Sequence, residues 1–500
     1  MRRPTALAAL LCAALLAPAA SGQDADGPGP GETVTLGEAI EIAVRRSPDV
    51  RRAAAADRAL GLAVRSASVG RLPTVSAQVT PQQRYGLGFD QTTGQAVSQT
   101  VETMSVGVGA SLPLYDGGRV RAVAAQARLE REAAAVGIDR TRQLVALDVA
   151  ERFLQLLLDR ALVEIQEEQL AAAEATLARV TELVEAGARP RADVIAQEAV
   201  VAERQTALVE ARGAVALDRV VLVQAVGLDP AGDYRFVGPS PESLDAGALA
   251  PISLGAADLV AAARAARVDR QAQELRIRAA EAAVGVARAA GRPSVELTAS
   301  VGTGYSSLQQ ELVDPGAVQP VQPVTLEDGT QVFVGGEPLT FPAGSPALQT
   351  SPFFDQFADN RSGAVGLTLS LPIFDRYAAR RGVVEAQVAA EDARIELEAL
   401  DRQLAAEVQQ AAVQAETARA RAAAAAVQVR AAAEALRVER DRYELGAGTL
   451  YDVAQAQARL AEAEAARAQA VYGLAFRQAL LRLAVGDVDV GRLADEIGGS

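Results

Sequence analysis

The chain has 500 residues, no histidine and a single cysteine; half of its residues are hydrophobic, and only 4% are aromatic. Without histidine, and with so little cysteine, catalysis by Ser-His or Cys-His pairs and the usual zinc sites are excluded. Catalysis by carboxylates alone stays open in principle, but nothing in the sequence supports it, so we expect no enzymatic activity, no cofactor and no metal site. The net charge of −14 at pH 7 argues against nucleic acid as a partner.

Residues 1–22 have the pattern of a secretory signal peptide. Arg2 and Arg3 precede an apolar run from Leu7 to Leu16, and small residues follow it. The run is shorter than the roughly 20 apolar residues that a membrane-spanning helix needs. The only cysteine, Cys12, lies inside this run, so the mature chain is predicted to have no disulfide and no lipid attached through a thiol.

The next segment predicts a helix followed by a β-hairpin. Apolar residues at helical spacing run from Leu36 to about Val69, with a break or restart at Pro48. Over residues 73–115, apolar residues then alternate with small and polar ones, apart from a polar loop in the middle. This two-residue period is typical of strands with two unlike faces, and each strand is expected to have about ten residues.

The stretch Leu112-Pro113-Leu114-Tyr115-Asp116-Gly117-Gly118 is where the strand pattern changes to a helix pattern. Pro113 cannot donate a ladder hydrogen bond, and Gly117 and Gly118 let the backbone turn. An Ala-, Arg- and Glu-rich run continues to a turn at Gly187, and a second helix returns to about Val226. The sequence therefore predicts a long helical hairpin over residues 117–226.

The same order of elements recurs in the second half of the chain. Leu371-Pro372-Ile373-Phe374-Asp375 repeats the junction, and 371 − 112 = 259 equals the offset between the two hairpin turns, 446 − 187 = 259. We predict a duplication with residues 23–250 as the first repeat and 251–500 as the second. The second repeat would contain a helix, a β-hairpin over 293–374 with a longer loop, a helical hairpin over 376–485 and a C-terminal tail.

The predicted helices have faces of small residues, which let helices approach closely. One such face repeats at three- and four-residue steps: Ala411, Ala415, Ala418, Ala422 and Ala425. The chain has a predicted signal peptide, and its predicted strands each have one apolar face. Together these features fit an outer-membrane β-barrel that is closed by several copies of the chain. The strands alone fit a soluble sandwich, or a strand pair packed on helices, equally well.

The chain resembles the TolC family of outer-membrane efflux proteins from Leu36 to about Gly486. The motifs that carry the resemblance are Leu36-Gly37-Glu38-Ala39, Leu72-Pro73, the two Leu-Pro junctions, and Tyr443-Glu444-Leu445-Gly446-Ala447-Gly448-Thr449-Leu450-Tyr451-Asp452-Val453. The resemblance implies a mainly α fold with a β-barrel. Three protomers would form a twelve-stranded outer-membrane barrel continuous with a long periplasmic α-helical barrel.

The resemblance also implies a function and partners. The homotrimer, held in outer-membrane lipid, would be the exit duct of a tripartite efflux or type I secretion system. It would receive a drug, metal ion or polypeptide from an inner-membrane pump through a periplasmic adaptor. The rival interpretation is a periplasmic adaptor or a structural coiled-coil protein without a pore, but an adaptor usually has one helical hairpin rather than two.

Site residues follow from the resemblance. Acidic residues at Asp452 and three positions later narrow the periplasmic mouth in the family, but here the later position is Gln455, so one ring of carboxylates is missing. Tyr443 and Asp193 match a pair that holds the mouth shut, whereas the basic residue often found at Gly448 is absent. We therefore expect a weaker closure. Asp193 and Asp452 also fit simple capping of a helix N-terminus.

The two hairpin turns are the segments that would meet the adaptor according to the resemblance. A glycine there also fits a plain helix C-cap. The residues expected at this contact are Ala186, Gly187, Arg189, Leu445, Gly446 and Thr449.

Overall fold

The computed structural model describes residues 33–90, 95–245, 255–313, 321–334, 337–338, 340–342 and 347–487. The predicted signal peptide lies outside these residues. Within the described ranges, no helix is both long and apolar enough to cross a membrane. The chain divides into two compact units, formed by the described parts of Met1–Leu60, Glu130–Ile277 and Asp392–Ser500, and by those of Gly61–Leu129 and Arg278–Glu391.

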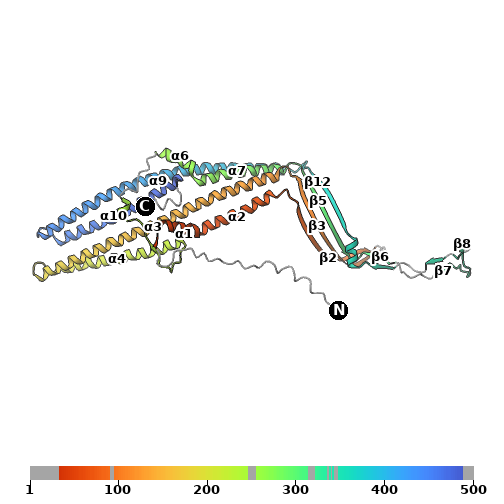
Figure 1. Cartoon of the computed structure of the whole chain (residues 1–500), viewed down its shortest axis with the longest axis horizontal. Coiled ribbons are helices and arrows are strands. Elements are labelled where there is room, and N and C mark those ends of the chain that lie inside the picture. Colours follow the sequence, from red (N-terminus) through yellow and green to blue (C-terminus); the bar gives the residue numbers. More distant parts are fainter. Residues whose placement is uncertain are drawn as a thin grey trace. The chain divides into compact units, whose positions relative to one another are not determined.

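Long helices and strands alternate along the chain, and Figure 1 labels them. The helices are α1 (Leu36–Arg46), α2 (Pro48–Ser68), α3 (Arg119–Glu185), α4 (Arg191–Val226), α5 (Pro241–Asp245), α6 (Ala256–Ala266), α7 (Val268–Ala289), α8 (Phe353–Asp359), α9 (Ala378–Glu444) and α10 (Leu450–Val485). The longer strands are β2 (Thr74–Asp90), β3 (Gln95–Tyr115), β5 (Ser294–Ser306) and β12 (Ser362–Ser370). The short strands are β1 (Thr33–Val34), β4 (Arg235–Phe236), β6 (Gln310–Val313), β7 (Val321–Pro323), β8 (Phe333–Val334), β9 (Glu337–Pro338), β10 (Thr340–Pro342) and β11 (Ala347–Thr350).

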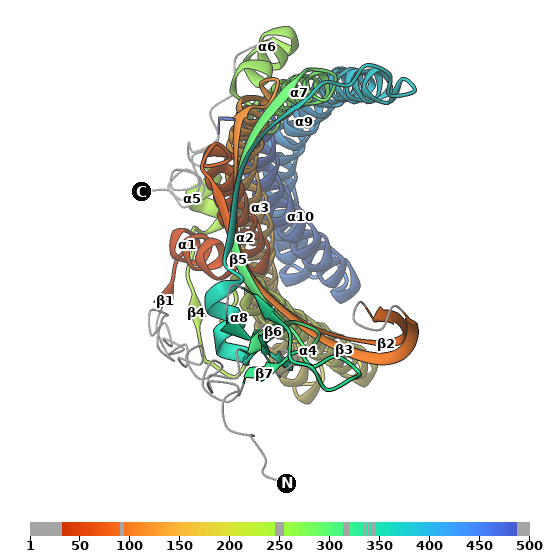
Figure 2. The same cartoon turned by 90° about the vertical axis from the view of Figure 1, so that its right-hand side faces the viewer.

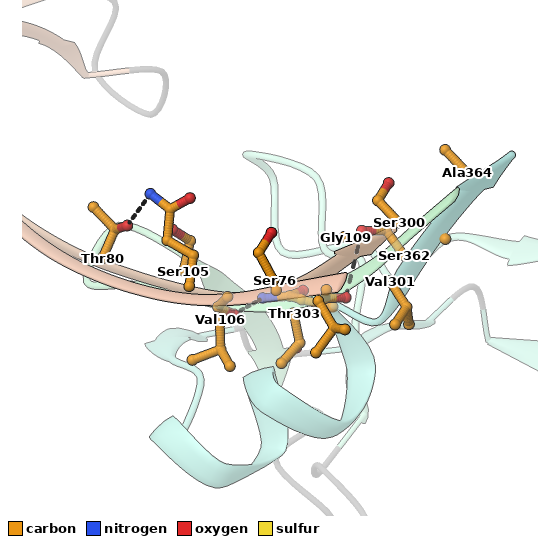
Figure 3. Close-up of a pocket in the computed structure, with 17 residues that line it drawn as sticks. Ser76, Thr80, Ser105, Val106, Gly109, Ser300, Val301, Thr303, Ser362 and Ala364 are labelled. Atoms are coloured by element: carbon orange, nitrogen blue, oxygen red, sulfur yellow. Dashed lines mark hydrogen bonds between the residues drawn. The ribbon is translucent and has the colours of Figure 1, made fainter. Parts of the chain in front are cut away.

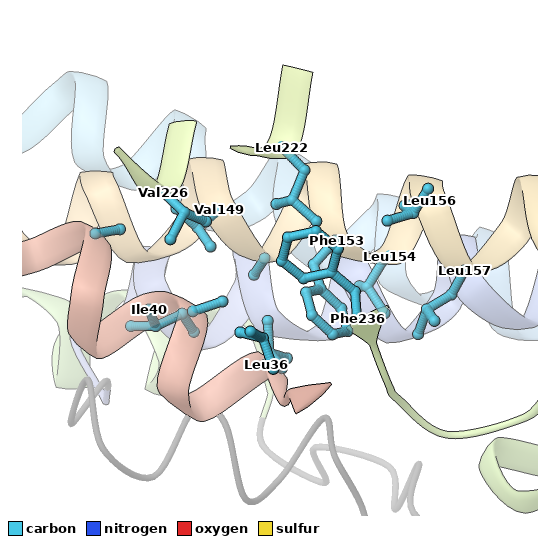
Figure 4. Packing of buried hydrophobic residues seen from close by; sticks show 14 of the residues in the cluster. Leu36, Ile40, Val149, Phe153, Leu154, Leu156, Leu157, Leu222, Val226 and Phe236 are labelled. Atoms are coloured by element: carbon cyan, nitrogen blue, oxygen red, sulfur yellow. The ribbon is translucent and has the colours of Figure 1, made fainter. Parts of the chain in front are cut away.

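The first unit is helical, and its core gathers around Phe153 of α3. Phe153 is fully buried and meets Phe236 of β4 edge to face, with ring centroids 6.0 Å apart (Figure 4). Leu36 and Ile40 of α1 are buried in the same cluster. Thr35 and Glu38 form a capping box that starts α1, so the Leu36-Gly37-Glu38-Ala39 motif sets where this helix begins. The buried side chains of α1 therefore hold this helix against α3 and α4.

A second seam in this unit is built from small residues of α9. Leu404 and Val408 are fully buried, and they pack with α6 and α10. The small face predicted from the sequence continues the seam, because four of its members are buried: Ala411, Ala415, Ala422 and Ala425.

The second unit contains a four-stranded antiparallel sheet in the order β12-β5-β3-β2. Figure 2 shows that the sheet is curved. The strand register places apolar residues side by side on one face of the sheet, and small or polar residues side by side on the other. One apolar row consists of Val75, Ala110, Ala299 and Val365, and the neighbouring row on the opposite face consists of Ser76, Gly109, Ser300 and Ala364. The alternation in the sequence therefore becomes two chemically different faces.

Two details of the strands differ from the sequence prediction. β2 and β3 have 17 and 21 residues, longer than the expected ten, because backbone pairing between them continues through the segment predicted as a polar loop. In the second hairpin, β12 pairs with β5 and ends at Ser370, so Pro372 follows the strand instead of lying in it. The predicted loop between β5 and β12 contains short strands and helix α8.

Candidate functional site

The turns of the two helical hairpins have the same backbone geometry. Gly187 follows α3 with φ 71° and Gly446 follows α9 with φ 74°, both in the left-handed region that glycine adopts without strain. The amide of Gly187 donates to the carbonyl of Val184 (3.0 Å), and that of Gly446 donates to the carbonyl of Tyr443 (3.1 Å). The amides of the next residues donate to Leu183 and Arg442, which completes a Schellman cap at each turn. Each glycine therefore acts as a helix cap, whatever else the turn contacts.

The turns present side chains to the surroundings. Leu445 is 84% exposed, so the second turn presents a large apolar side chain at its surface. The other residues predicted to contact an adaptor are also accessible: Ala186, Gly187, Gly446 and Thr449 are exposed, and Arg189 is partly covered. Their contact with an adaptor stays a prediction.

Asp452 lies in the first turn of α10 and forms a capping box with Thr449. Asp452 Oδ2 accepts hydrogen bonds from the Thr449 hydroxyl (2.7 Å) and the Thr449 amide (3.0 Å), and the Asp452 amide donates to Thr449 Oγ1 (3.2 Å). These hydrogen bonds to the charged form lower the pKa of Asp452 below its usual value. The capping role weighed from the sequence is thus present, and it keeps a charged carboxylate at this position. Gln455 follows on the same helix and is exposed.

Tyr443 contacts the other hairpin turn through Arg189. The Arg189 guanidinium lies over the Tyr443 ring, with Cζ 4.7 Å from the ring centroid. The ring is partly buried against Leu436 and Val453, while Tyr443 Oη is buried without a hydrogen-bond partner among the described residues. Asp193 lies in the first turn of α4, and it is not the partner of Tyr443 Oη within this chain. The structure therefore brings Tyr443 to Arg189 rather than to Asp193.

The strand-to-helix junctions are similar but not identical. Pro113 lies in β3 next to a register shift against β5, as expected for a residue without an N–H. Gly117 and Gly118 have φ 68° and 92°. At the positions 259 residues later, Arg376 and Tyr377 adopt φ 55° and 64°, which is rare for residues with a side chain.

Each junction also carries a helix cap. The Asp116 carboxylate accepts from the amides of Gly118 (3.0 Å) and Val120 (2.5 Å) at the start of α3. Asp375 Oδ2 accepts from the Ala379 amide (2.7 Å) at the start of α9. The aspartate that follows each Leu-Pro segment therefore fixes the first turn of a long helix.

Two carboxyl groups that are shielded from water, Asp159 and Glu464, were not predicted from the sequence. Asp159 of α3 is buried, and burial together with a hydrogen bond to Asp218 of α4 raises its pKa to about 6. Burial, and secondarily the charge of Glu168, raises the pKa of Glu464. No short sequence motif predicts these sites, because each pair joins helices that are distant in sequence.

The chain matches the outer membrane efflux protein family over residues 39–228 and 259–487. A curated relative, the outer membrane efflux protein BepC of Brucella suis biovar 1 (strain 1330), is 28% identical over 191 residues. That match covers 38% of this chain and 40% of BepC, so it spans less than half the length of the relative.

Solved structures of outer-membrane channels share the fold. CusC, whose crystal structures concern folding and transmembrane channel formation, aligns with a TM-score of 0.70 at 17% identity, covering 90% of this chain and 92% of that one. The open-state MtrE outer membrane channel of Neisseria gonorrhoeae aligns with a TM-score of 0.66 at 22% identity, covering 90% and 89%. VceC, an outer membrane protein of Vibrio cholerae, aligns with a TM-score of 0.66 at 18% identity, covering 90% and 96%.

The family match covers more than half of the chain, and both repeats predicted from the sequence contribute to it. The fold agrees with that of outer-membrane channels. These findings favour a channel over a periplasmic adaptor. The chain belongs to the outer membrane efflux protein family.

Proposed function

We propose that this chain forms, as a homotrimer, the outer-membrane exit duct of an efflux or type I secretion system. The observation that carries the proposal is the four-stranded sheet, in which β2 and β12 are the edge strands. An open strand edge leaves backbone N–H and C=O groups that lipid cannot satisfy. Three copies joined edge to edge give twelve strands and remove every open edge.

The two faces of the sheet fit the two environments of a barrel wall. Small and polar residues, among them Ser76, Ser105 and Ser300, line a hollow of about 650 Å³ on the concave face (Figure 3). Val75 and Val365 on the other face are 68% and 79% exposed, which would be unfavourable in water. The apolar face therefore meets lipid, and the polar face lines the duct.

The helical hairpins extend into the periplasm in this proposal, and their turns meet the periplasmic adaptor of an inner-membrane pump. Exposed Leu445 beside the Gly446 turn provides an apolar contact for such a partner. The Schellman caps keep each turn short, so that a groove on the adaptor can pack closely against the turn.

The periplasmic mouth is narrowed by three copies of Asp452 and held closed by contacts between the hairpin turns. The lowered pKa of Asp452 keeps these carboxylates charged, so the mouth favours cations. Arg189 on Tyr443 provides a closing contact within each protomer. Tyr443 Oη is buried without a partner within the described chain, so Asp193 of a neighbouring protomer would reach it only after the ring became accessible.

Crosslinking tests the trimer directly. The single cysteine of the chain lies in the predicted signal peptide, so cysteines can be introduced into an otherwise thiol-free mature protein. Val79→Cys in β2 and Leu367→Cys in β12 place one thiol on each edge strand. With a short bis-maleimide, the membrane-inserted double variant should give a covalent trimer on a denaturing gel.

The matched control places the two cysteines on the central strands. Val108 and Val301 are paired between β3 and β5, so Val108→Cys with Val301→Cys should crosslink only within a chain. Monomers alone from both variants, in protein shown to be folded and inserted, would contradict the trimeric duct.

A further inference from the structure

Helix α8 lies on the apolar face of the sheet. It comes between β11 and β12 and packs against β5. In Figure 3, Val106, Val301 and Thr303 point from the sheet toward the side where this helix lies, whereas Ser76 and Ser300 point to the opposite, hollowed side. A helix on this face is outside the duct in the proposed assembly.

The helix is held in place by hydrogen bonds to the end of β5. The Thr303 hydroxyl donates to the Phe357 carbonyl (2.8 Å), and the Ser306 amide donates to Gln356 Oε1 (2.8 Å). Asn360, which follows the helix, donates from Nδ2 to the Gly304 carbonyl (2.7 Å). Gln356 is only 1% exposed. These contacts fix α8 on the strand, so its outer side chains have a defined position.

Four aromatic rings gather at this point. The ring of Phe353 is tilted against those of Tyr305 of β5 (5.0 Å between centroids) and Phe357 (4.7 Å), and it meets the ring of Phe354 edge to face at 5.4 Å. Phe354 is 82% exposed, so the cluster is not a closed core among the described residues. Only 4% of the residues in this chain are aromatic, yet three of these rings lie on one short helix and the fourth lies on the strand beside it. A partly exposed apolar grouping of this kind indicates an interaction surface.

The position along the strand identifies that surface. A barrel strand crosses the hydrocarbon layer in roughly 9–11 residues. Strand β5 starts at Ser294, shortly after the end of α7, and Tyr305 lies 305 − 294 = 11 residues further along the chain. If the apolar face begins at this start, Tyr305 and α8 reach the far boundary of the membrane, where aromatic side chains collect in outer-membrane barrels.

We infer that α8 and the aromatic cluster of Tyr305, Phe353, Phe354 and Phe357 dock into the boundary between headgroups and acyl chains in the outer leaflet. This inference rests on the proposed function, which makes the apolar face the lipid face. The cluster sits at the distal end of that face and continues it. Asp355 and Asp359, on the same helix, lie on exposed positions and stay on the aqueous side of the boundary.

The chain has no tryptophan, so one introduced tryptophan is a unique depth probe. Phe354→Trp keeps an exposed aromatic ring on α8. Val365→Trp, opposite Ala299 in the middle of the strand span, probes the acyl core. Leu326→Trp, in an exposed loop, probes water. Each variant is reconstituted into phosphatidylcholine vesicles brominated either near the headgroup or near the ends of the acyl chains.

Phe354→Trp should be quenched more by shallow than by deep bromine, Val365→Trp more by deep than by shallow bromine, and Leu326→Trp by neither. Quenching of Val365→Trp together with unquenched, water-like emission from Phe354→Trp would overturn the anchor while leaving the barrel proposal intact. Stronger deep than shallow quenching of Phe354→Trp would also overturn it. If Val365→Trp in folded protein is not quenched either, the proposed function itself fails.

Discussion

The guanidinium of Arg189 stacks on the ring of Tyr443 at 4.7 Å, and the two residues belong to different helical hairpins. The contact therefore joins the two turns of one protomer. It places a basic residue, Arg189, beside the second turn, where Gly448 stands instead of the basic residue expected from the resemblance. A cation on an aromatic ring contributes about 0.5–1 kcal/mol at an accessible site. A weak contact of this kind suits a closure that must open.

We expect Arg189→Gln to favour the open mouth. Loss of the stacking energy should raise the open-to-closed ratio roughly two- to fivefold per protomer. Single-channel recording in planar bilayers measures this as longer or larger open events. Arg191→Gln, which removes an exposed charge two residues away, is the matched control and should behave as wild type. Equal effects of both variants would mean that charge at the turn, and not stacking, sets the conductance.

Substitution can separate helix capping by Asp452 from its proposed role in the periplasmic mouth. Asp452→Asn removes the charge but keeps an oxygen that can accept from Thr449, whereas Asp452→Ala removes both. Cation selectivity, measured as the reversal potential in a salt gradient, should fall in both variants. Selectivity retained in Asp452→Asn would leave helix capping as the role of this residue.

Asp159 makes stability depend on pH. Its folded-state pKa of about 6 lies above the unfolded value, so the native state binds more protons between about pH 4 and 6 and loses stability as pH rises through that window. Asp159→Asn removes this penalty. We expect an apparent melting temperature higher than that of wild type by about 2–4 °C at pH 7.5 and unchanged at pH 4.

The partner of Asp159 provides the control for this effect. Asp218→Asn should give a smaller gain at pH 7.5, because it removes the contribution of Asp218 but leaves the burial of Asp159, the larger cause, in place. The double variant should gain little more than Asp159→Asn alone. Gains that do not change with pH would contradict the assignment to Asp159.

The two strand-to-helix junctions should respond differently to substitution. A Cβ on Gly117 would lie 2.8 Å from Arg292 Cβ and 2.9 Å from the Ala289 carbonyl oxygen, and the positive φ adds strain. Gly117→Ala should therefore destabilise the protein by more than 1–2 kcal/mol, the approximate cost of a left-handed residue alone. Arg376→Gly should be nearly neutral, since relief of strain offsets the entropy that glycine loses on folding. Thermal unfolding of both variants measures the contrast; equal losses would contradict it.

Much of the architecture can be read from the sequence because it rests on local patterns. Helices α4 and α10 end at Val226 and Val485, directly before Gly227 and Gly486 in the left-handed conformation. The strand faces follow from alternation, since antiparallel register keeps like residues in one row. Helix α8 could not be predicted in this way, because a helix of 7 residues among short strands has too little periodicity.

The site could be predicted only in part. The Thr449–Asp452 capping box has a local signature, three residues apart, before a helix. The Arg189–Tyr443 and Asp159–Asp218 contacts join residues on different helices, and nothing local marks their partners. Likewise, the left-handed backbone conformation falls on glycines at the first junction but on Arg376 and Tyr377 at the second. The sequence gives no sign of this, and only the backbone geometry shows it.

If this chain forms a gated channel of the outer membrane, the purified mature protein should conduct ions across a planar bilayer. We expect small, cation-selective steps that become larger or longer in Arg189→Gln and lose selectivity in Asp452→Ala. Folded, membrane-inserted protein that passes no current, in the wild type and in both variants, would contradict it.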